Sequence, residues 1–121
     1  MIRPFIRVLL ASVVAALAVP ALAFAAQPKV LAIHFDTEVN PVTSSYLDHQ
    51  LQRAQDGHYN AAVILIDTPG GLSDAMRKIV QKEVALKIPV IAYVSPSGAR
   101  AASAGVWIEE AADVAAMGTA T

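Results

Sequence analysis

The sequence predicts an α/β fold built from parallel βαβ units. Short apolar segments rich in Val and Ile alternate with segments whose apolar residues recur at helical spacing. Strands that alternate with helices are joined by right-handed crossovers and form a parallel sheet. Functional residues of such sheets lie beyond the carboxyl ends of the strands, where the sequence has two glycine-bearing turns, residues 67–72 and 97–105.

Residues 1–25 have the layout of a secretory signal peptide. Arg3 and Arg7 precede an apolar core that is ended by a proline and followed by small residues. Cleavage after Ala23 or after Ala25 fits this pattern equally well. A retained membrane anchor is the alternative, although the core of 12 residues is short for a helix that spans a bilayer.

Residues 26–121 are then expected to form one small domain. Two of the nine Lys and Arg side chains lie before it, so the domain carries seven basic against ten acidic side chains. That balance gives no basic patch for nucleic acid. The chain has no cysteine, which excludes disulfides and thiolate metal sites, and we expect neither a metal nor a cofactor.

The first βα unit shows both a strand pattern and helix-end signals. Lys29–Phe35 is β-branched and apolar, which favours a strand. Asn40 and Pro41 predict the start of a helix, because Asn caps and Pro suits the first helical position. Gly57 is placed to end that helix. The apolar residues of the helix fall on one face: Tyr46, Leu47, Leu51 and Ala54.

The later units repeat this alternation. Ala61–Asp67 is apolar on both faces, as a central parallel strand should be. The following helix has apolar residues at helical spacing, and we expect its charged residues, Glu83 among them, on the solvent side. The rest of the chain predicts a strand over Ile88–Val94, a helix over Ala101–Ala112 and a strand over Val114–Met117.

Ser103 is the candidate nucleophile. Only Ala and Gly flank it, so its hydroxyl is accessible, and a strand-to-helix turn supplies backbone N–H groups beside it. We expect the oxyanion donors to be the N–H of Ala104 and one N–H of the pair Gly70 and Gly71, where glycine lets the backbone approach a substrate. A purely structural role is the alternative, because a serine between alanines packs well and a glycine pair makes an ordinary turn.

A general base for Ser103 is harder to find. The histidines all precede the serine and none is a persuasive partner: His34, His49 and His58. A lysine base must be buried beside the serine so that desolvation lowers its pKa towards neutrality, and no lysine follows Ser103. We expect Asp67 and Arg100 to hold loops rather than to react.

Two motifs carry a resemblance to a known family. Asp67–Leu72 (DTPGGL) and Gly98–Gly105 (GARAASAG) resemble the N-terminal protease domain of NfeD-like membrane-bound serine proteases, which have the ClpP/crotonase fold. The resemblance covers residues 28–121. It implies a serine–lysine dyad endopeptidase that cuts hydrophobic segments of membrane-associated proteins, especially stomatin-like ones. It also implies Ser103 as the nucleophile and an oxyanion hole lined by Gly70, Gly71 and Ala104.

The resemblance also implies features that residues 1–121 lack. The lysine of the family lies a few dozen residues beyond the serine, past Thr121, and the transmembrane helices and C-terminal OB-like domain are absent too. We therefore expect a ClpP/crotonase-like fold that is incomplete at its C-terminus, and a fragment that is inactive alone. Family subunits associate, which implies a homo-oligomer. With the signal peptide, the family predicts export to the periplasmic or extracytoplasmic face of the membrane.

Two other functions stay open at the level of sequence. A crotonase-like acyl-CoA enzyme uses the same sheet and paired backbone N–H groups, but an export signal argues against a cytoplasmic cofactor such as coenzyme A. A catalytically inert homologue that binds membrane-protein partners is the non-enzymatic alternative, which the missing lysine favours. We also expect residues 26–121 to fold poorly alone, because nothing covers apolar sheet faces such as that of Val63, Ile64 and Leu65.

Overall fold

The computed structural model of this protein describes residues 27–121, and the predicted signal peptide lies outside these residues. A parallel sheet has the strand order β1-β2-β3-β4, so each strand pairs with the next one in the chain. The α/β class with parallel βαβ units is therefore confirmed. The elements are β1 (Val30–Phe35), α2 (Pro41–Asp56), β2 (Ala61–Ile66), α3 (Ser73–Ala85), β3 (Val90–Val94), α4 (Ala104–Ala111) and β4 (Val114–Met117).

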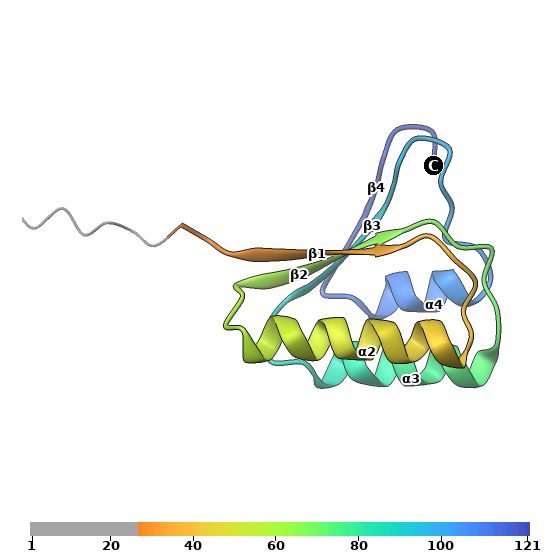
Figure 1. The fold of residues 1–121 in the computed structure, drawn as a ribbon. Helices are drawn as coiled ribbons and strands as arrows, with labels where there is room; N and C mark the ends of the chain where they lie inside the picture. The colour runs from red at the N-terminus through yellow and green to blue at the C-terminus, as the bar shows by residue number, and fades with distance from the viewer. Residues whose placement is uncertain (1–26) are drawn as a thin grey trace, which may run out of the picture.

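The three helices cover the same face of the sheet (Figure 1). The core lies between them and the inward-facing strand residues, and its largest side chains are at most 2% exposed. In this arrangement the carboxyl ends of the strands and the first residues of the helices lie at the same end of the molecule. The core side chains include Ile33, Phe35, Leu47, Leu51, Ile64, Ile66, Ile79 and Ile108.

Local signals account for the first helix. The Asn40 side chain accepts hydrogen bonds from the N–H groups of Val42 and Thr43, and the Thr43 hydroxyl accepts one from the Asn40 N–H at 3.0 Å. This reciprocal arrangement is a capping box. Pro41 is the first helical residue and Gly57 is the C-cap. The predicted start and end of this helix are therefore confirmed.

The other face of the sheet has no helix on it among the described residues (Figure 1). Val63 and Leu65 of β2 are half-buried there, and they pair in register with Ile91 and Tyr93 of β3. Ile64, which we expected on an uncovered face, instead lies on the helix side and is 0% exposed. Alternation along the strand separates it from its two neighbours.

The last helix begins later than predicted, at Ala104 rather than Ala101. Ala101 forms a parallel bridge with Thr68, and the Ala102 N–H donates to the Thr68 carbonyl at 3.0 Å. These contacts hold the chain extended up to Ser103, and they override the helical propensity of the alanines. The third strand also starts later, at Val90, because Pro89 has no N–H for the ladder.

Glu83 is buried, which corrects its expected place in solvent. It lies on the same face of α3 as Ala75 and Ile79 and is 3% exposed. Neither carboxylate oxygen has a hydrogen-bond partner among the described residues. Burial first, and then the Asp113 carboxylate, raise the pKa of Glu83 to about 9.

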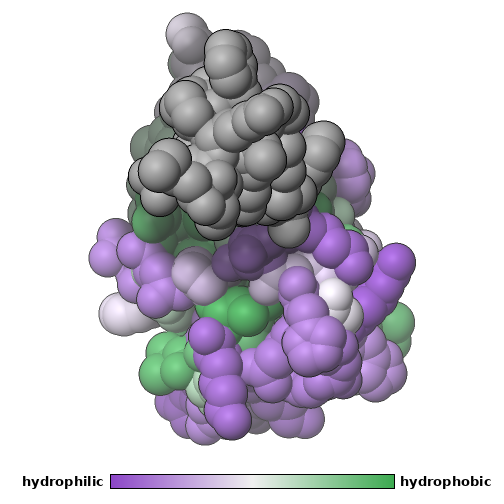
Figure 2. Space-filling view, turned by 90° about the vertical axis from the view of Figure 1, so that its left-hand side faces the viewer, coloured by the Kyte–Doolittle hydropathy of each residue, from purple (hydrophilic) through white to green (hydrophobic). Residues whose placement is uncertain are grey.

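The end of the molecule where the strands begin has a mainly hydrophilic surface around a small hydrophobic patch, where described residues are visible (Figure 2). Among residues 27–121, no helix combines the length and the apolarity needed to cross a bilayer.

Candidate active site

Ser103 lies at the carboxyl end of the sheet, on the turn that leads into α4. Its backbone has φ 53° and ψ −114°, a region that residues with a side chain rarely adopt, and such strain costs about 1–3 kcal/mol. A sharp, strained strand-to-helix turn is also the device that exposes the nucleophile of α/β-hydrolases. Ser103 is exposed, and it occupies the N-cap position without making a side-chain capping bond. Its hydroxyl is therefore free for other chemistry.

Thr68 connects the two glycine-bearing turns. It is 0% exposed, its N–H donates to the Arg100 carbonyl at 2.7 Å, and its carbonyl accepts from the Ala102 N–H. Its hydroxyl accepts a hydrogen bond from the Gly70 N–H at 3.1 Å. Sequence reasoning gave Thr68 no role, although a threonine directly after an apolar strand is suited to this one.

Gly70 lies directly against the serine. A Cβ added to Gly70 would come within 2.6 Å of the Ser103 Cβ and 3.1 Å of the Ala104 nitrogen. Its φ of 100° also favours glycine. Any side chain at this position would push the serine turn away from the glycine turn.

Gly71 is held by the loop after β1. The Val39 N–H donates to the Gly70 carbonyl and the Leu72 N–H donates to the Val39 carbonyl, both at 2.8 Å. A Cβ on Gly71 would overlap the Val39 carbonyl oxygen. The glycine pair therefore fits between the Val39 backbone and Ser103.

The backbone donors at this site are not equivalent. The Gly70 N–H is already bonded to the Thr68 hydroxyl. By contrast, the N–H groups of Gly71 and Ala104 donate to no acceptor within residues 27–121. Ala104 is also the first residue of α4, so its N–H lies at the positive end of the helix dipole.

The acid–base groups of the sequence lie elsewhere. An Asp67 carboxylate oxygen accepts a hydrogen bond from the backbone N–H of Arg100 at 3.2 Å, which confirms that Asp67 holds the loop. The histidines considered as bases are all exposed: His34, His49 and His58. In the described part of the chain, no group of three or more His, Asp or Glu residues is arranged to hold a metal ion.

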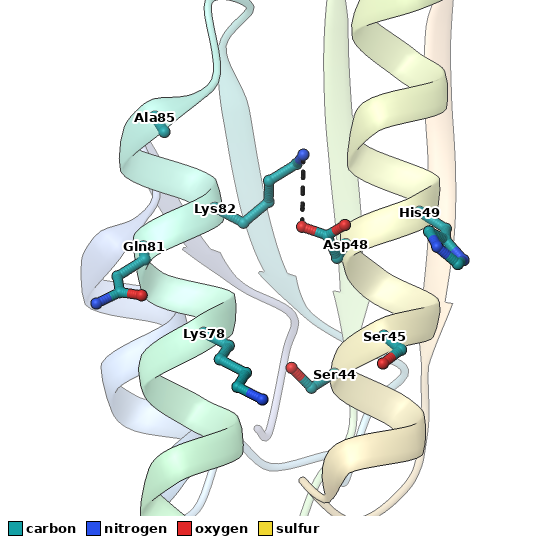
Figure 3. A pocket seen from close by; sticks show the side chains of 8 residues that line it. All are labelled: Ser44, Ser45, Asp48, His49, Lys78, Gln81, Lys82 and Ala85. Atoms are coloured by element: carbon teal, nitrogen blue, oxygen red, sulfur yellow. Dashed lines mark ion pairs between the residues drawn. The ribbon is translucent and has the colours of Figure 1, made fainter.

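None of the lysines in residues 27–121 lies on the turns that form the site. Lys78 and Lys82 line a cavity of about 410 Å³ between α2 and α3, to which residues 97–105 contribute nothing (Figure 3). The Lys82 ammonium donates to Gln52 Oε1 at 2.6 Å and lies 3.4 Å from an Asp48 carboxylate oxygen. The other two, Lys29 and Lys87, precede strands and so lie at the far end of the sheet.

Comparison with known proteins shows the family of the chain. The chain matches the family "NfeD1b, N-terminal domain" over residues 29–121. A membrane-bound protease of Pyrococcus horikoshii is 42% identical over 84 residues, which make up 69% of this chain and 19% of the relative. Membrane protein NfeD1b of Bacillus subtilis is 36% identical over 84 residues, or 69% of this chain and 18% of its own.

Solved structures share the fold. The 1510-N membrane-bound stomatin-specific protease, as a serine-to-alanine mutant, has a TM-score of 0.74 and 38% identity, over 76% of this chain and 44% of its own. Its lysine-to-alanine mutant, in complex with a substrate peptide, has a TM-score of 0.73 and 39% identity, over 76% and 42%. A ClpP1 mutant from Listeria monocytogenes, 24% identical over 67% of this chain and 46% of its own, shares the fold alone, with a TM-score of 0.60.

The fold is therefore that of ClpP-like protease domains, as expected. The chain belongs to the NfeD family, and it corresponds to the N-terminal domain of that family. It spans about a fifth of the length of the curated relatives that it matches, and less than half of the solved 1510-N chain.

Proposed function

We propose that this chain carries the nucleophile and the oxyanion hole of an exported serine endopeptidase. One observation carries the proposal: an uncapped, exposed hydroxyl on a strained turn that lies against Gly70, with the unoccupied N–H groups of Ala104 and Gly71 on the residues that follow the serine and that glycine in the chain. A serine used only for packing needs no such backbone strain, and a serine used only as a cap would bond to the helix start.

In the proposed mechanism, Ser103 Oγ attacks the carbonyl carbon of the scissile peptide bond. A base accepts the hydroxyl proton and delivers it to the leaving amine as the C–N bond breaks, and a water molecule then hydrolyses the acyl-serine to release the other product. The N–H groups of Gly71 and Ala104 donate to the oxygen that gains negative charge. Removing one donor of this kind slows catalysis by about 100-fold to 1000-fold in other enzymes. Gly70 provides the close approach rather than a donor, because its N–H is bonded to Thr68.

We assign the base to a lysine supplied from outside residues 1–121. The four lysines of the described residues lie between α2 and α3 or at the far end of the sheet. The two mutants of the 1510-N protease replace a serine and a lysine, the pair that such a dyad requires. Residues 27–121 alone are then inactive, because the hydroxyl has no proton acceptor.

The proposed substrate is an apolar segment of a membrane-associated protein of the stomatin type. The similar 1510-N protease is named as specific for stomatin. Residues 1–25 would direct export, and residues 26–121 would form the first part of the protease domain at the extracytoplasmic face. In this account the full enzyme is a homo-oligomer that needs neither a cofactor nor a metal.

Hydrolysis of an apolar peptide by the natural protein that contains these residues tests the proposal. Ser103→Ala should abolish cleavage. Ser97→Ala is the matched control, because Ser97 is an exposed serine of the same connection and should be dispensable. Cleavage that survives Ser103→Ala would exclude the assignment. Tight acyl-CoA binding without peptide cleavage would instead favour the crotonase-like alternative.

A further inference from the structure

The hydroxyl of Thr68 engages one of the two glycine N–H groups that could serve as an oxyanion donor. It accepts a hydrogen bond from the Gly70 N–H at 3.1 Å, within the glycine turn, residues 67–72. The Thr68 side chain is 0% exposed and Gly70 is buried too, so this bond is made away from bulk water. Without the hydroxyl, the Gly70 N–H would be a buried donor with no acceptor, which is unfavourable.

The methyl group of the same side chain faces the start of α4. A Cβ added to Gly105 would lie 2.6 Å from Thr68 Cγ2. Gly105 is buried in the first turn of α4, directly after Ala104. The methyl group therefore lies against the helix at a position where only glycine leaves enough space.

These two contacts come from the two branches of one side chain. The hydroxyl and the methyl group of a threonine share one Cβ, and such β-branched side chains have little freedom at χ1. The proposed oxyanion donors are the N–H groups of Gly71 and Ala104, and they belong to the two segments that Thr68 contacts. Rotation or loss of the Thr68 side chain would therefore change how the two donors are placed relative to each other.

We infer that Thr68 is a positioning residue of the proposed oxyanion hole. By occupying the Gly70 N–H it leaves Gly71 as the donor of the glycine turn, and through its methyl group it fixes that turn against the start of α4. The inference rests on the proposed peptidase function. Thr68 itself touches no substrate, because it is fully buried. It acts through the placement of donors that stabilise charge in the transition state.

Separating the two branches of the side chain tests the inference. Thr68→Val keeps the shape and loses the hydroxyl, whereas Thr68→Ser keeps the hydroxyl. In the natural protein that contains these residues, Thr68→Val should lower kcat for an apolar peptide at least about tenfold. KM should stay within about twofold, because misplaced oxyanion donors weaken transition-state binding alone. Thr68→Ser should restore most of the lost kcat. All kcat values are expressed per site titrated with a serine-directed phosphonate, so that loss of folded protein does not count as loss of catalysis.

Ser44→Ala is the control for a hydroxyl that is only structural. Ser44 is 3% exposed, and its hydroxyl donates to the Ala75 carbonyl at 3.2 Å, between α2 and α3. Its removal should lower the unfolding temperature without lowering kcat per titrated site.

A second pair of variants tests the methyl contact and does not depend on the folding of Thr68→Val. Gly105→Ala places a methyl group against Thr68 Cγ2, so it should lower kcat per titrated site at least about tenfold. Thr68→Ser removes Cγ2, so the double variant Thr68→Ser/Gly105→Ala should recover most of that loss. Such recovery is the non-additivity expected of groups in contact.

Three results would overturn the inference. They are an unchanged kcat per titrated site in Thr68→Val, equal losses in Thr68→Val and Thr68→Ser, and a Gly105→Ala loss that the double variant does not recover. Ser103→Ala is measured beside these variants. Cleavage that survives Ser103→Ala would remove the peptidase proposal, whereas the three results above, with Ser103→Ala inactive, would remove only the role of Thr68.

Discussion

At the scale of single residues, the position of Ser103 depends on neighbouring side chains and backbone groups that take no part in the reaction. Thr68 forms hydrogen bonds within its own turn and to the serine turn. Gly70 leaves space for the serine, and a methyl group at this position would fill that space. The sequence predicts that Gly70 or Gly71 supplies a donor. It leaves the choice between the two glycines open, because it does not reveal that the Gly70 N–H donates to the Thr68 hydroxyl two residues away. Such a contact depends on a rotamer, and no spacing rule reveals it.

Gly70→Ala should reduce peptide cleavage by about 100-fold, because the new methyl group would displace the serine from the proposed oxyanion donors. Gly98→Ala is the matched control: Gly98 also has a positive φ, 86°, but an added Cβ meets nothing within 4 Å. The left-handed backbone costs each variant about 1–2 kcal/mol. The measurement is kcat/KM for an apolar peptide, and equal losses in the two variants would contradict the contact.

At the scale of elements, the sequence predicts the ends of a helix correctly where the residues that determine them lie close by in the chain. The ends of α2 are specified by Asn40, Pro41 and Gly57, whose effects act within a few residues, and the sequence predicts them correctly. The start of α4 is determined by Thr68, more than thirty residues away, and the alanines before Ser103 wrongly predict an earlier start. The burial of Glu83 is likewise a tertiary effect, because the apolar pattern of α3 fits more than one face.

Glu83 makes stability depend on pH. Its pKa of about 9 in the folded protein lies above the ordinary value of 4.5, so the folded state keeps a proton that the unfolded chain releases. The stability linked to this proton is complete below pH 4.5 and is lost as the pH rises towards 9. The free energy of unfolding should therefore fall by up to about 1.4 kcal/mol per pH unit in that window.

Glu83→Gln should remove this slope and stabilise the protein near pH 8. Glu38→Gln, at an exposed position of the loop after β1, should leave the slope unchanged. Urea unfolding of the natural protein between pH 5 and about pH 8 measures both variants. Parallel curves for Glu83→Gln and the unaltered protein would show that the carboxyl group is not buried as described.

At the scale of the whole molecule, the helices of residues 27–121 cover one face of the sheet and leave the other face without a helix. The other face presents half-buried apolar residues that include Leu65 and Tyr93. We predict that residues 26–121 alone unfold without a sharp cooperative transition, because a two-layer domain of this size buries little apolar surface. Differential scanning calorimetry tests this, and a single sharp peak would contradict it.

The central claim is that Ser103 is the presented nucleophile, and mapping a covalent adduct tests it most directly. After treatment of the natural protein with a serine-directed phosphonate, cleavage at Lys87 and Arg100 puts Ser95 and Ser97 in one peptide and Ser103 in the next. We predict that tandem mass spectrometry finds the phosphonate on Ser103, and that Ser103→Ala carries none. A phosphonate on the peptide of residues 88–100, or one that persists in Ser103→Ala, would contradict the claim.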